Sequence, residues 1–437
     1  MSRRGFATRQ VHEHARRDDG APIATSRATP IYLTAGFEFG EYDDAAAHFG
    51  RGEGYAYTRI GNPTVDAVEH TLAALEGGSQ ALLLASGQAA TTVALLGLLE
   101  AGQHIVASTH IYEGTRGLLR DNLTRLGITS TFVDDIDQLD AWDAAILPTT
   151  RVLFAESISN ASNRLVDIPA LAALARRHGI TLVIDNTFAT PYLLRPLELG
   201  ADVVVHSASK FLAGHGSVLG GAIVDSGRLD TDSAPRLYPH LVAPGRGGAP
   251  SIIDRVGGDA RIAYAREAVA PRFGPTPSPL NAFLIGQGIE TLSLRVERQS
   301  ANALAVAQWL EGRPEVVSVD YIGLPSHRDH ALAARDLTAG YGSVFSFTLR
   351  GDAETARRFV EALEVFTHMT HLGDVRSLVL HPASTSHAAL TEAERAALGV
   401  QAGTLRVSIG IEDVADLLED LAQALTVASD VSVAVVA

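Results

Sequence analysis

Apolar residues recur at helical spacing in the first strongly patterned segment of the chain. From Pro63 onward, Val65, Val68, Leu72 and Leu75 fall on one helix face, and a pair of glycines follows them. This spacing predicts an amphipathic helix that stops at the glycines.

Short runs of β-branched and other apolar residues then alternate with helix-length segments. The runs predict buried strands at 81–86, 104–109, 129–134, 151–157, 181–186 and 201–207. The intervening segments predict helices at 91–102, 114–126 and 167–179. Such alternation is typical of an α/β fold with a mostly parallel sheet between two layers of helices.

Both ends of the chain depart from this pattern. The first sixty residues lack a clear period and contain many turn formers, so we expect an extended arm. Beyond about Gly257, a long helix at 292–312 and strands at 342–351 and 404–411 predict a smaller α+β domain. We expect a mobile connector at 241–251. The expected division is an arm at 1–60, a large domain at 61–256 and a C-terminal domain at 257–437.

Composition narrows the class of protein. The chain has 437 residues, 46% of them hydrophobic, as in ordinary globular proteins of two or three domains. A net charge of −15 argues against nucleic-acid binding. No apolar run reaches the roughly 18 residues that span a bilayer, and the first residues lack a signal-peptide pattern. The absence of cysteine excludes disulfides and thiolate chemistry and suits the cytoplasm, where we expect the protein.

The segment 203–221 carries the clearest chemical signal. A strand-like run ends in Ser207 and Ser209, Lys210 comes next, and Asp185 ends the preceding apolar strand. A lysine amine can form a Schiff base with pyridoxal phosphate, an aspartate can keep its pyridinium nitrogen protonated, and serines can bind its phosphate. Alone, each residue would more often be an ordinary surface lysine or turn aspartate, so the interpretation depends on their combination.

Eight ordered motifs resemble the Cys/Met-metabolism branch of fold-type I (aspartate-aminotransferase-like) pyridoxal-phosphate enzymes, and within it most of all the O-acetylhomoserine sulfhydrylases. The motifs are YTRIGNPT, ALEGG, SGQAA, IDNTFATPYL, VVVHSASKFLAGHG, GQGIETLSLRVER, GDVRSLVLHPASTSH and TLRVSIGIED. The resemblance implies a seven-stranded, mostly parallel sheet, a smaller C-terminal domain and a pyridoxal 5′-phosphate cofactor.

The resemblance also implies roles for residues around the cofactor. Lys210 is the Schiff-base lysine and proton shuttle, and Asp185 is the partner of the pyridinium nitrogen. Tyr112 stacks on the ring and assists proton transfer, and Asn160 lies near the phenolic oxygen.

Two further groups of residues are expected to bind the phosphate of the cofactor. Gly87 and Gln88 lie where a strand turns into a helix, and backbone N–H groups and the helix dipole there suit a dianion. Ser207 and Ser209 add hydroxyl donors. An ordinary strand–helix turn is the alternative.

Two arm residues imply an oligomer. Tyr57 and Arg59 resemble the pair that reaches the phosphate of a neighbouring subunit. The resemblance therefore implies a homo-oligomer, expected to be a dimer of dimers, with shared active sites.

Substrate binding is implied for Arg406, Ser384, Ser386 and His371. Arg406 resembles the arginine that binds the substrate α-carboxylate, with a structural salt bridge to Glu412 or Asp413 as the alternative. The two serines line the implied pocket.

The histidines do not form a recognisable metal motif. Several cluster between 368 and 387, and 327–330 reads HRDH, but no zinc spacing is present. We expect no catalytic metal and a solvated loop at HRDH.

Four departures from the family pattern fall at the implied pocket mouth. They are Glu113 beside the stacking tyrosine, His371 for the usual asparagine, the segment 241–253 in place of an aromatic stretch, and Ala35–Gly36 in place of threonine–serine. His371 suits a base toward an incoming thiol near neutral pH, and a nearby Glu113 would raise its pKa. Exposure of both to solvent is the alternative.

The implied reaction is γ-replacement on O-acetylhomoserine, or a similar O-acylated homoserine, by sulfide or a thiol. Elimination at Cγ, as in methionine or cystathionine γ-lyases, and replacement by a carbon or bulkier thiol nucleophile remain open. A non-catalytic scaffold with the same fold is a further alternative. The joint presence of Lys210, Asp185 and Arg406 argues against it.

Overall fold

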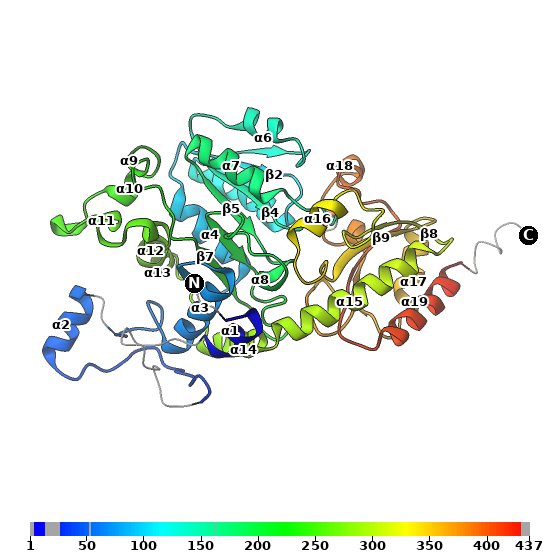
Figure 1. The fold of residues 1–437 in the computed structure, drawn as a ribbon, viewed down its shortest axis with the longest axis horizontal. Helices are drawn as coiled ribbons and strands as arrows, with labels where there is room; N and C mark the ends of the chain where they lie inside the picture. The colour runs from blue at the N-terminus through cyan, green and yellow to red at the C-terminus, as the bar shows by residue number, and fades with distance from the viewer. Residues whose placement is uncertain (1–3, 14–26, 52–53, 161, 430–437) are drawn as a thin grey trace, which may run out of the picture.

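The computed structural model describes residues 4–13, 27–51, 54–160 and 162–429. Two sheets form the centres of two adjoining domains, and the long helix α15 (Leu292–Glu311) runs from one domain to the other (Figure 1). The fold is α/β, with a mostly parallel large sheet and a separate C-terminal sheet, as expected.

The large sheet has seven strands in the order β1-β7-β6-β5-β4-β2-β3. They are β1 (Gln80–Leu84), β2 (His104–Ser108), β3 (Thr129–Val133), β4 (Thr150–Glu156), β5 (Thr181–Asp185), β6 (Val203–His206) and β7 (Gly221–Asp225). Strands β3, β2, β4, β5 and β6 are mutually parallel, whereas β7 runs antiparallel to both β6 and β1. The sequence pattern did not predict β7.

Helices cover both faces of this sheet because its strands are apolar on both sides. In β5, Leu182 and Ile184 pack into one core and Val183 into the other. The first core includes α3 (Pro63–Glu76), α7 (Ile168–His178) and α14 (Pro279–Glu290). The second includes α4 (Gly87–Leu98), α12 (Ala260–Tyr264) and the π-helical turn Leu118–Leu123.

The predicted helix ends are confirmed by their caps. Asn62 accepts a hydrogen bond from the N–H of Thr64 at the start of α3, and Gly77 ends that helix in the left-handed region at φ 74°. Asp167 caps α7 in the same way, and Gly179 ends it. The helix expected at 114–126 consists of α5 (Glu113–Gly117) followed by π-helical and 3₁₀ turns.

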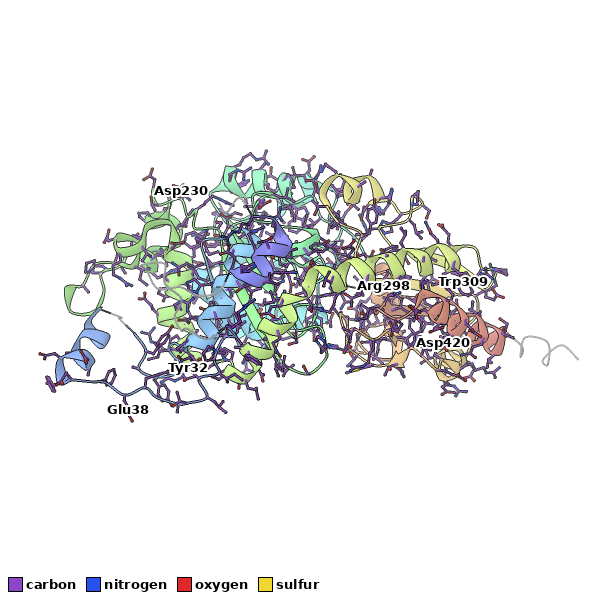
Figure 2. The ribbon with its side chains drawn as sticks, turned by 60° about the horizontal axis from the view of Figure 1, so that its bottom comes forward. Tyr32, Glu38, Asp230, Arg298, Trp309 and Asp420 are labelled. Atoms are coloured by element: carbon purple, nitrogen blue, oxygen red, sulfur yellow. The ribbon has the colours of Figure 1, made fainter. Side chains whose placement is uncertain are left out.

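The arm is not extended throughout, contrary to expectation. It contains α1 (Phe6–His12) and α2 (Tyr42–Arg51). The ring centroids of Phe6 and Tyr192 lie 5.2 Å apart, so apolar packing holds α1 against the large domain. The segment with Tyr32 and Glu38 and the helix α2 project from the large domain (Figures 1 and 2).

The C-terminal sheet has five strands in the order β10-β11-β12-β9-β8. They are β8 (Val316–Asp320), β9 (Val344–Leu349), β10 (Thr367–His368), β11 (Leu378–Leu380) and β12 (Thr404–Ser408). Helices α17 (Ala353–Ala362) and α19 (Val414–Ser429) share its core. The remaining short helices are α6 (Leu139–Ala145), α8 (Thr190–Leu193), α9 (Ala234–Leu237), α10 (Pro239–Val242), α11 (Ile252–Val256), α13 (Ala270–Phe273), α16 (His330–Asp336) and α18 (Glu392–Ala397).

The hydrophobic cores on the two faces of the large sheet include residues beyond position 257. Residues 260–296 contribute to the two cores of the large domain, and the core of the C-terminal domain begins at Ala303. The expected connector is tied down at both ends, since Leu241 is buried and Ser251 forms a capping box with Asp254. Among the described residues, no helix has the length and apolar character needed to cross a membrane.

Candidate active site

Lys210 follows β6 on a loop between the two domains and is partly buried. Burial, followed by the charge of Arg406, lowers the pKa of its amine to about 8. About a tenth of the amine is therefore uncharged and nucleophilic at pH 7, far more than for an ordinary lysine. Lys210 is also the only lysine in the sequence, since the other 34 of 35 basic residues are arginine. This count, visible in the sequence, is a signal that pattern analysis did not use.

Asp185 ends β5 with its carboxylate held by Thr187. The N–H and the hydroxyl of Thr187 donate to it at 2.9 and 2.5 Å, and the same hydroxyl accepts from the N–H of Ser207 at 2.8 Å. Burial raises the pKa of Asp185, whereas these hydrogen bonds lower it. A cation beside Asp185 would stabilise its charge, as a protonated ring nitrogen does. Thr187 was not identified from the sequence.

The start of α4 forms a cradle suited to a phosphate. Ser86 caps the helix through the N–H of Ala89, which leaves the N–H groups of Gly87 and Gln88 without partners among the described residues. A Cβ on Gly87 would lie 2.6 Å from the Cβ of Ser207, so only glycine fits there. Free N–H groups at a helix N-terminus beside a serine favour a dianion.

Ser209, also predicted to bind the phosphate, hydrogen-bonds within its own loop. Its hydroxyl donates to the carbonyl of Gly220 at 3.1 Å and accepts from the N–H of the same residue at 3.0 Å. The structure thus uses Ser209 to close the loop that follows Lys210.

Tyr112 and Asn160 are held by one buried carboxylate that sequence reasoning missed. Glu156, the last residue of β4, accepts from the N–H of Tyr112 at 2.6 Å and from the N–H of Asn160 at 3.1 Å. The Tyr112 ring is 51% exposed and lies against Gly114, where a Cβ would come within 2.4 Å of it. Its ring is therefore free to cover a flat ligand.

Arg406, on β12, is buried without a carboxylate partner among the described residues. Its guanidinium donates to the side-chain oxygen of Asn160 and to the carbonyl of His371, both at 3.1 Å. Burial lowers its pKa to about 10. A buried cation bonded only to neutral groups favours an anionic ligand.

The alternative salt bridge for Arg406 is not formed. Glu412 accepts from the N–H and hydroxyl of Ser377, and Asp413 pairs with Arg298 at 3.3 Å.

His371 lies against the lysine, with its Nδ1 3.1 Å from the Nζ of Lys210. Burial and the charge of Lys210 lower its pKa to about 4. The prediction that Glu113 raises this pKa is therefore wrong, and Glu113 instead faces Arg116 at 3.6 Å. A neutral imidazole accepts a hydrogen bond from Lys210 but is a weak base near neutral pH.

The remaining predicted residues do not contact Lys210 or Arg406 in the described part of the chain. Ser384 and Ser386 bond the rings of His381 and His387 at 2.8 and 2.9 Å. Tyr57 and Arg59 form a cation–π pair 5.4 Å apart on the exposed arm. Arg59 also donates to the carbonyl of Pro271 at 2.6 Å.

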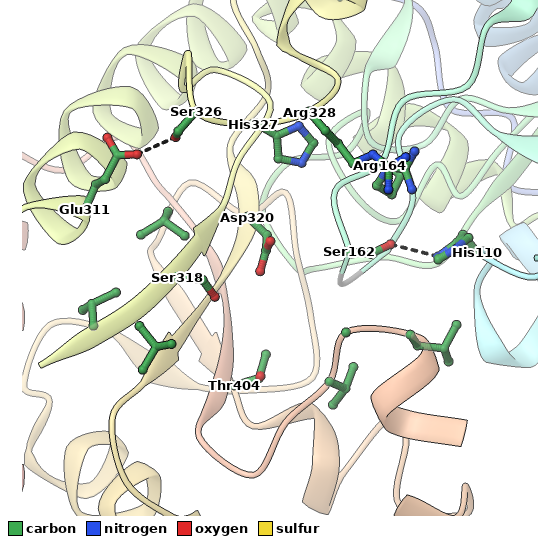
Figure 3. Close-up of a pocket in the computed structure, with 16 residues that line it drawn as sticks. His110, Ser162, Arg164, Glu311, Ser318, Asp320, Ser326, His327, Arg328 and Thr404 are labelled. Carbon is green, nitrogen blue, oxygen red and sulfur yellow. Dashed lines mark hydrogen bonds between the residues drawn. The ribbon is translucent and has the colours of Figure 1, made fainter. Parts of the chain in front are cut away.

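The HRDH segment is only partly solvated, contrary to expectation. Asp329 is buried and pairs with Arg164 at 2.7 Å. His327 and Arg328 border a cavity of about 520 Å³ between the domains, with Asp320 on its wall (Figure 3). None of the predicted cofactor residues lines this cavity. The described residues contain no cluster of His, Asp or Glu arranged to hold a metal ion.

A single, partly buried lysine on the loop after β6 of a mostly parallel sheet is typical of an α/β enzyme. The chain belongs to the Cys/Met metabolism PLP-dependent enzyme family, whose pattern matches residues 7–426. Its cofactor is pyridoxal 5′-phosphate, which the strand-end aspartate and the Gly87 cradle fit.

Several relatives are similar over nearly their whole length. An O-acetyl-L-homoserine sulfhydrylase from Leptospira meyeri is 42% identical, over 92% of this chain and 93% of the relative. One of the same name from Corynebacterium glutamicum is 40% identical, over 95% and 96%. An L-methionine gamma-lyase from Pseudomonas putida is 38% identical, over 96% and 97%.

A solved structure from Campylobacter jejuni, described as an O-acetylhomoserine (thiol)-lyase, superposes with a TM-score of 0.90 at 34% identity. The match covers 97% of this chain and 100% of that one. That structure carries N′-pyridoxyl-lysine-5′-monophosphate.

Proposed function

We propose that the protein catalyses γ-replacement on O-acetylhomoserine, or a similar O-acylated homoserine, with sulfide or a thiol. The observation that carries this proposal is Arg406, a buried guanidinium with two neutral partners and a lysine nearby. It suits the α-carboxylate of an amino-acid substrate. The names of the two sulfhydrylase relatives support the choice of reaction.

Each proposed site residue has a physical task. Pyridoxal phosphate, when bound, supplies an electron sink for negative charge at the substrate Cα. Asp185 would keep the ring nitrogen protonated, and Tyr112 would cover the ring face. Gly87, Gln88, Ser207 and Ser209 would bind the phosphate. Lys210 removes and returns protons at Cα and Cβ.

The overall change is balanced without an oxidant or reductant. The Cγ–O bond breaks and acetate leaves with its electron pair, while a Cγ–S bond forms. The proton lost by hydrogen sulfide neutralises the released acetate or passes to solvent. Homocysteine or a methionine-type thioether is the product.

A neighbouring subunit completes the proposed site. Tyr57 and Arg59 are both exposed, and no contact joins either of them to Lys210 in the described part of the chain, which fits a role across an interface. We propose a homo-oligomer, a dimer of dimers, located in the cytoplasm as the cysteine-free composition suggests.

The test is product analysis with O-acetylhomoserine, with and without sulfide. The proposal expects homocysteine and acetate in equal amounts when sulfide is present, and little turnover without it. Rapid sulfide-independent release of acetate, ammonia and a 2-oxo acid would instead establish γ-elimination, the reaction suggested by the gamma-lyase relative.

A further inference from the structure

Glu156 occupies an electrostatically unfavourable position. It ends β4 directly beside Asp185, its register partner at the end of β5, and its side chain is buried. Burial, and then the charge of Asp185, raise its pKa to about 8. Two adjacent buried carboxylates destabilise each other when both are ionised.

The hydrogen bonds explain why a carboxylate stands there. Oε1 of Glu156 accepts from the N–H of Tyr112, and Oε2 accepts from the N–H of Asn160. Both oxygens are thus needed as acceptors. A glutamine offers one acceptor and one donor, so it would set its NH₂ group against one of these N–H groups.

The two bonded residues have different proposed tasks in the site. Tyr112 presents its exposed ring, and Asn160 accepts from the guanidinium of Arg406 through its side-chain oxygen. One carboxylate therefore connects a ring-covering residue with the buried cation. The span runs from the large domain to β12 of the C-terminal domain.

We propose that Glu156 is a positioning residue that fixes the Tyr112 ring and the Arg406 guanidinium relative to each other. It would thereby hold the flat cofactor and the substrate carboxylate in one mutual orientation. The inference rests on the proposed function for the roles of Tyr112 and Arg406.

The test uses the holoenzyme variants Glu156→Gln and Glu156→Asp. A displacement on the order of 1 Å can cost about 10²-fold in rate, and we expect a loss of that size in kcat/KM for Glu156→Gln. We also expect a lower ratio of circular dichroism to absorbance in the visible cofactor band, because the ring is less firmly oriented. Glu156→Asp keeps both acceptors on a shorter side chain and should recover part of both signals.

Carboxylate recognition gives a readout independent of turnover. L-alanine and alaninol differ only in the carboxylate, so the ratio of their binding constants, followed by the spectral shift, reports the Arg406 contact. We expect Glu156→Gln to reduce the preference for alanine about tenfold, in line with a loss of well-oriented charge-assisted bonding. In an Asn160→Ala background the same change should have a smaller effect, because the connection to Arg406 is already broken.

Asp420 provides a matched control. It is another buried carboxylate that accepts backbone N–H groups, from Glu364, Val365 and Phe366, but it lies in the C-terminal domain (Figure 2). Asp420→Asn should lower the melting temperature without changing the dichroism ratio or the alanine preference.

The outcomes separate this inference from the proposed function. If wild type lacks the visible band or sulfhydrylase activity, the proposed function fails. If wild type is active but Glu156→Gln keeps both the dichroism ratio and the alanine preference, the positioning role is overturned. Equal spectral changes in Asp420→Asn would overturn it too, since general destabilisation would then explain them.

Discussion

At the scale of the residue, the chemistry depends on a lysine whose surroundings disfavour its charge. Lys210 is partly buried, faces the guanidinium of Arg406 through space, and contacts a neutral imidazole. Desolvation and a like charge both favour the free amine. His371 stays neutral for the same reasons, so it can accept a proton in a hydrogen bond without competing for the positive charge.

The ionisation of Lys210 can be measured directly because it is the only side-chain amine in the sequence. We predict that trinitrobenzenesulfonate labels the cofactor-free protein with a midpoint near pH 8. Reactivity should rise with pH through that value as the amine loses its proton. The Lys210→Ala variant supplies the background from the terminal amine, and a midpoint near the ordinary value for lysine would contradict the lowered pKa.

Arg406 is the second cause of this shift and the proposed carboxylate ligand. Arg406→Gln should raise the labelling midpoint, since one positive charge is removed. It should also lower kcat/KM for O-acetylhomoserine by about 10² or more, as expected when a buried charge-assisted pair is lost. An unchanged kcat/KM with an unchanged visible band would show that the substrate carboxylate binds elsewhere.

At the scale of the element, the N-terminus of α4 matters most because its first turn forms the anion cradle. Gly87→Ala places a methyl group 2.6 Å from the Cβ of Ser207. We predict at least about tenfold weaker pyridoxal phosphate binding in a visible titration, because the helix start must shift away from the serine.

Gly97→Ala on the same helix is the control. The nearest atom there is 3.6 Å from the new methyl group, and alanine favours helix by up to about 1 kcal/mol over glycine. This variant should bind the cofactor normally. Equal weakening in both variants would mean that the cradle is not the phosphate site.

Element prediction succeeded where periodicity and caps agree. Helices α3 and α7 are capped at their N-termini by Asn62 and Asp167 and are followed by glycines, and the sequence alone shows these residues. Strand β7 was missed because it follows a long glycine-rich loop and pairs antiparallel with distant β1. Helix α1 was missed because its burial depends on contact with Tyr192, far along the chain.

The site was predictable to the same extent. Asp185 ends β5 and Lys210 follows β6 on a loop, and the sequence pattern locates both strands. Glu156 also ends a strand, yet its importance comes from adjacency to Asp185 across the sheet, which one sequence does not reveal. The hydrogen bond of the Ser209 hydroxyl depends on a tertiary partner, Gly220. The burial of Asp329 likewise depends on its ion pair with Arg164.

At the scale of the whole molecule, the projecting arm is the feature that a single chain leaves unexplained. Arg59 and Tyr57 stack on each other at the surface. If they complete a neighbour's site, inactive Arg59→Ala and inactive Lys210→Ala proteins should complement when their subunits exchange. Random pairing would restore about one quarter of the sites of a dimer. Absence of recovery after proven exchange would mean that each site is built from one chain.

The central claim, a covalent cofactor link at Lys210, is tested most directly by borohydride reduction followed by mass spectrometry of the intact and digested protein. We predict one phosphopyridoxyl group per chain, confined to the peptide that contains Lys210 and absent from Lys210→Ala. An active wild type that acquires no label, or acquires it only at the terminal amine, would contradict the account.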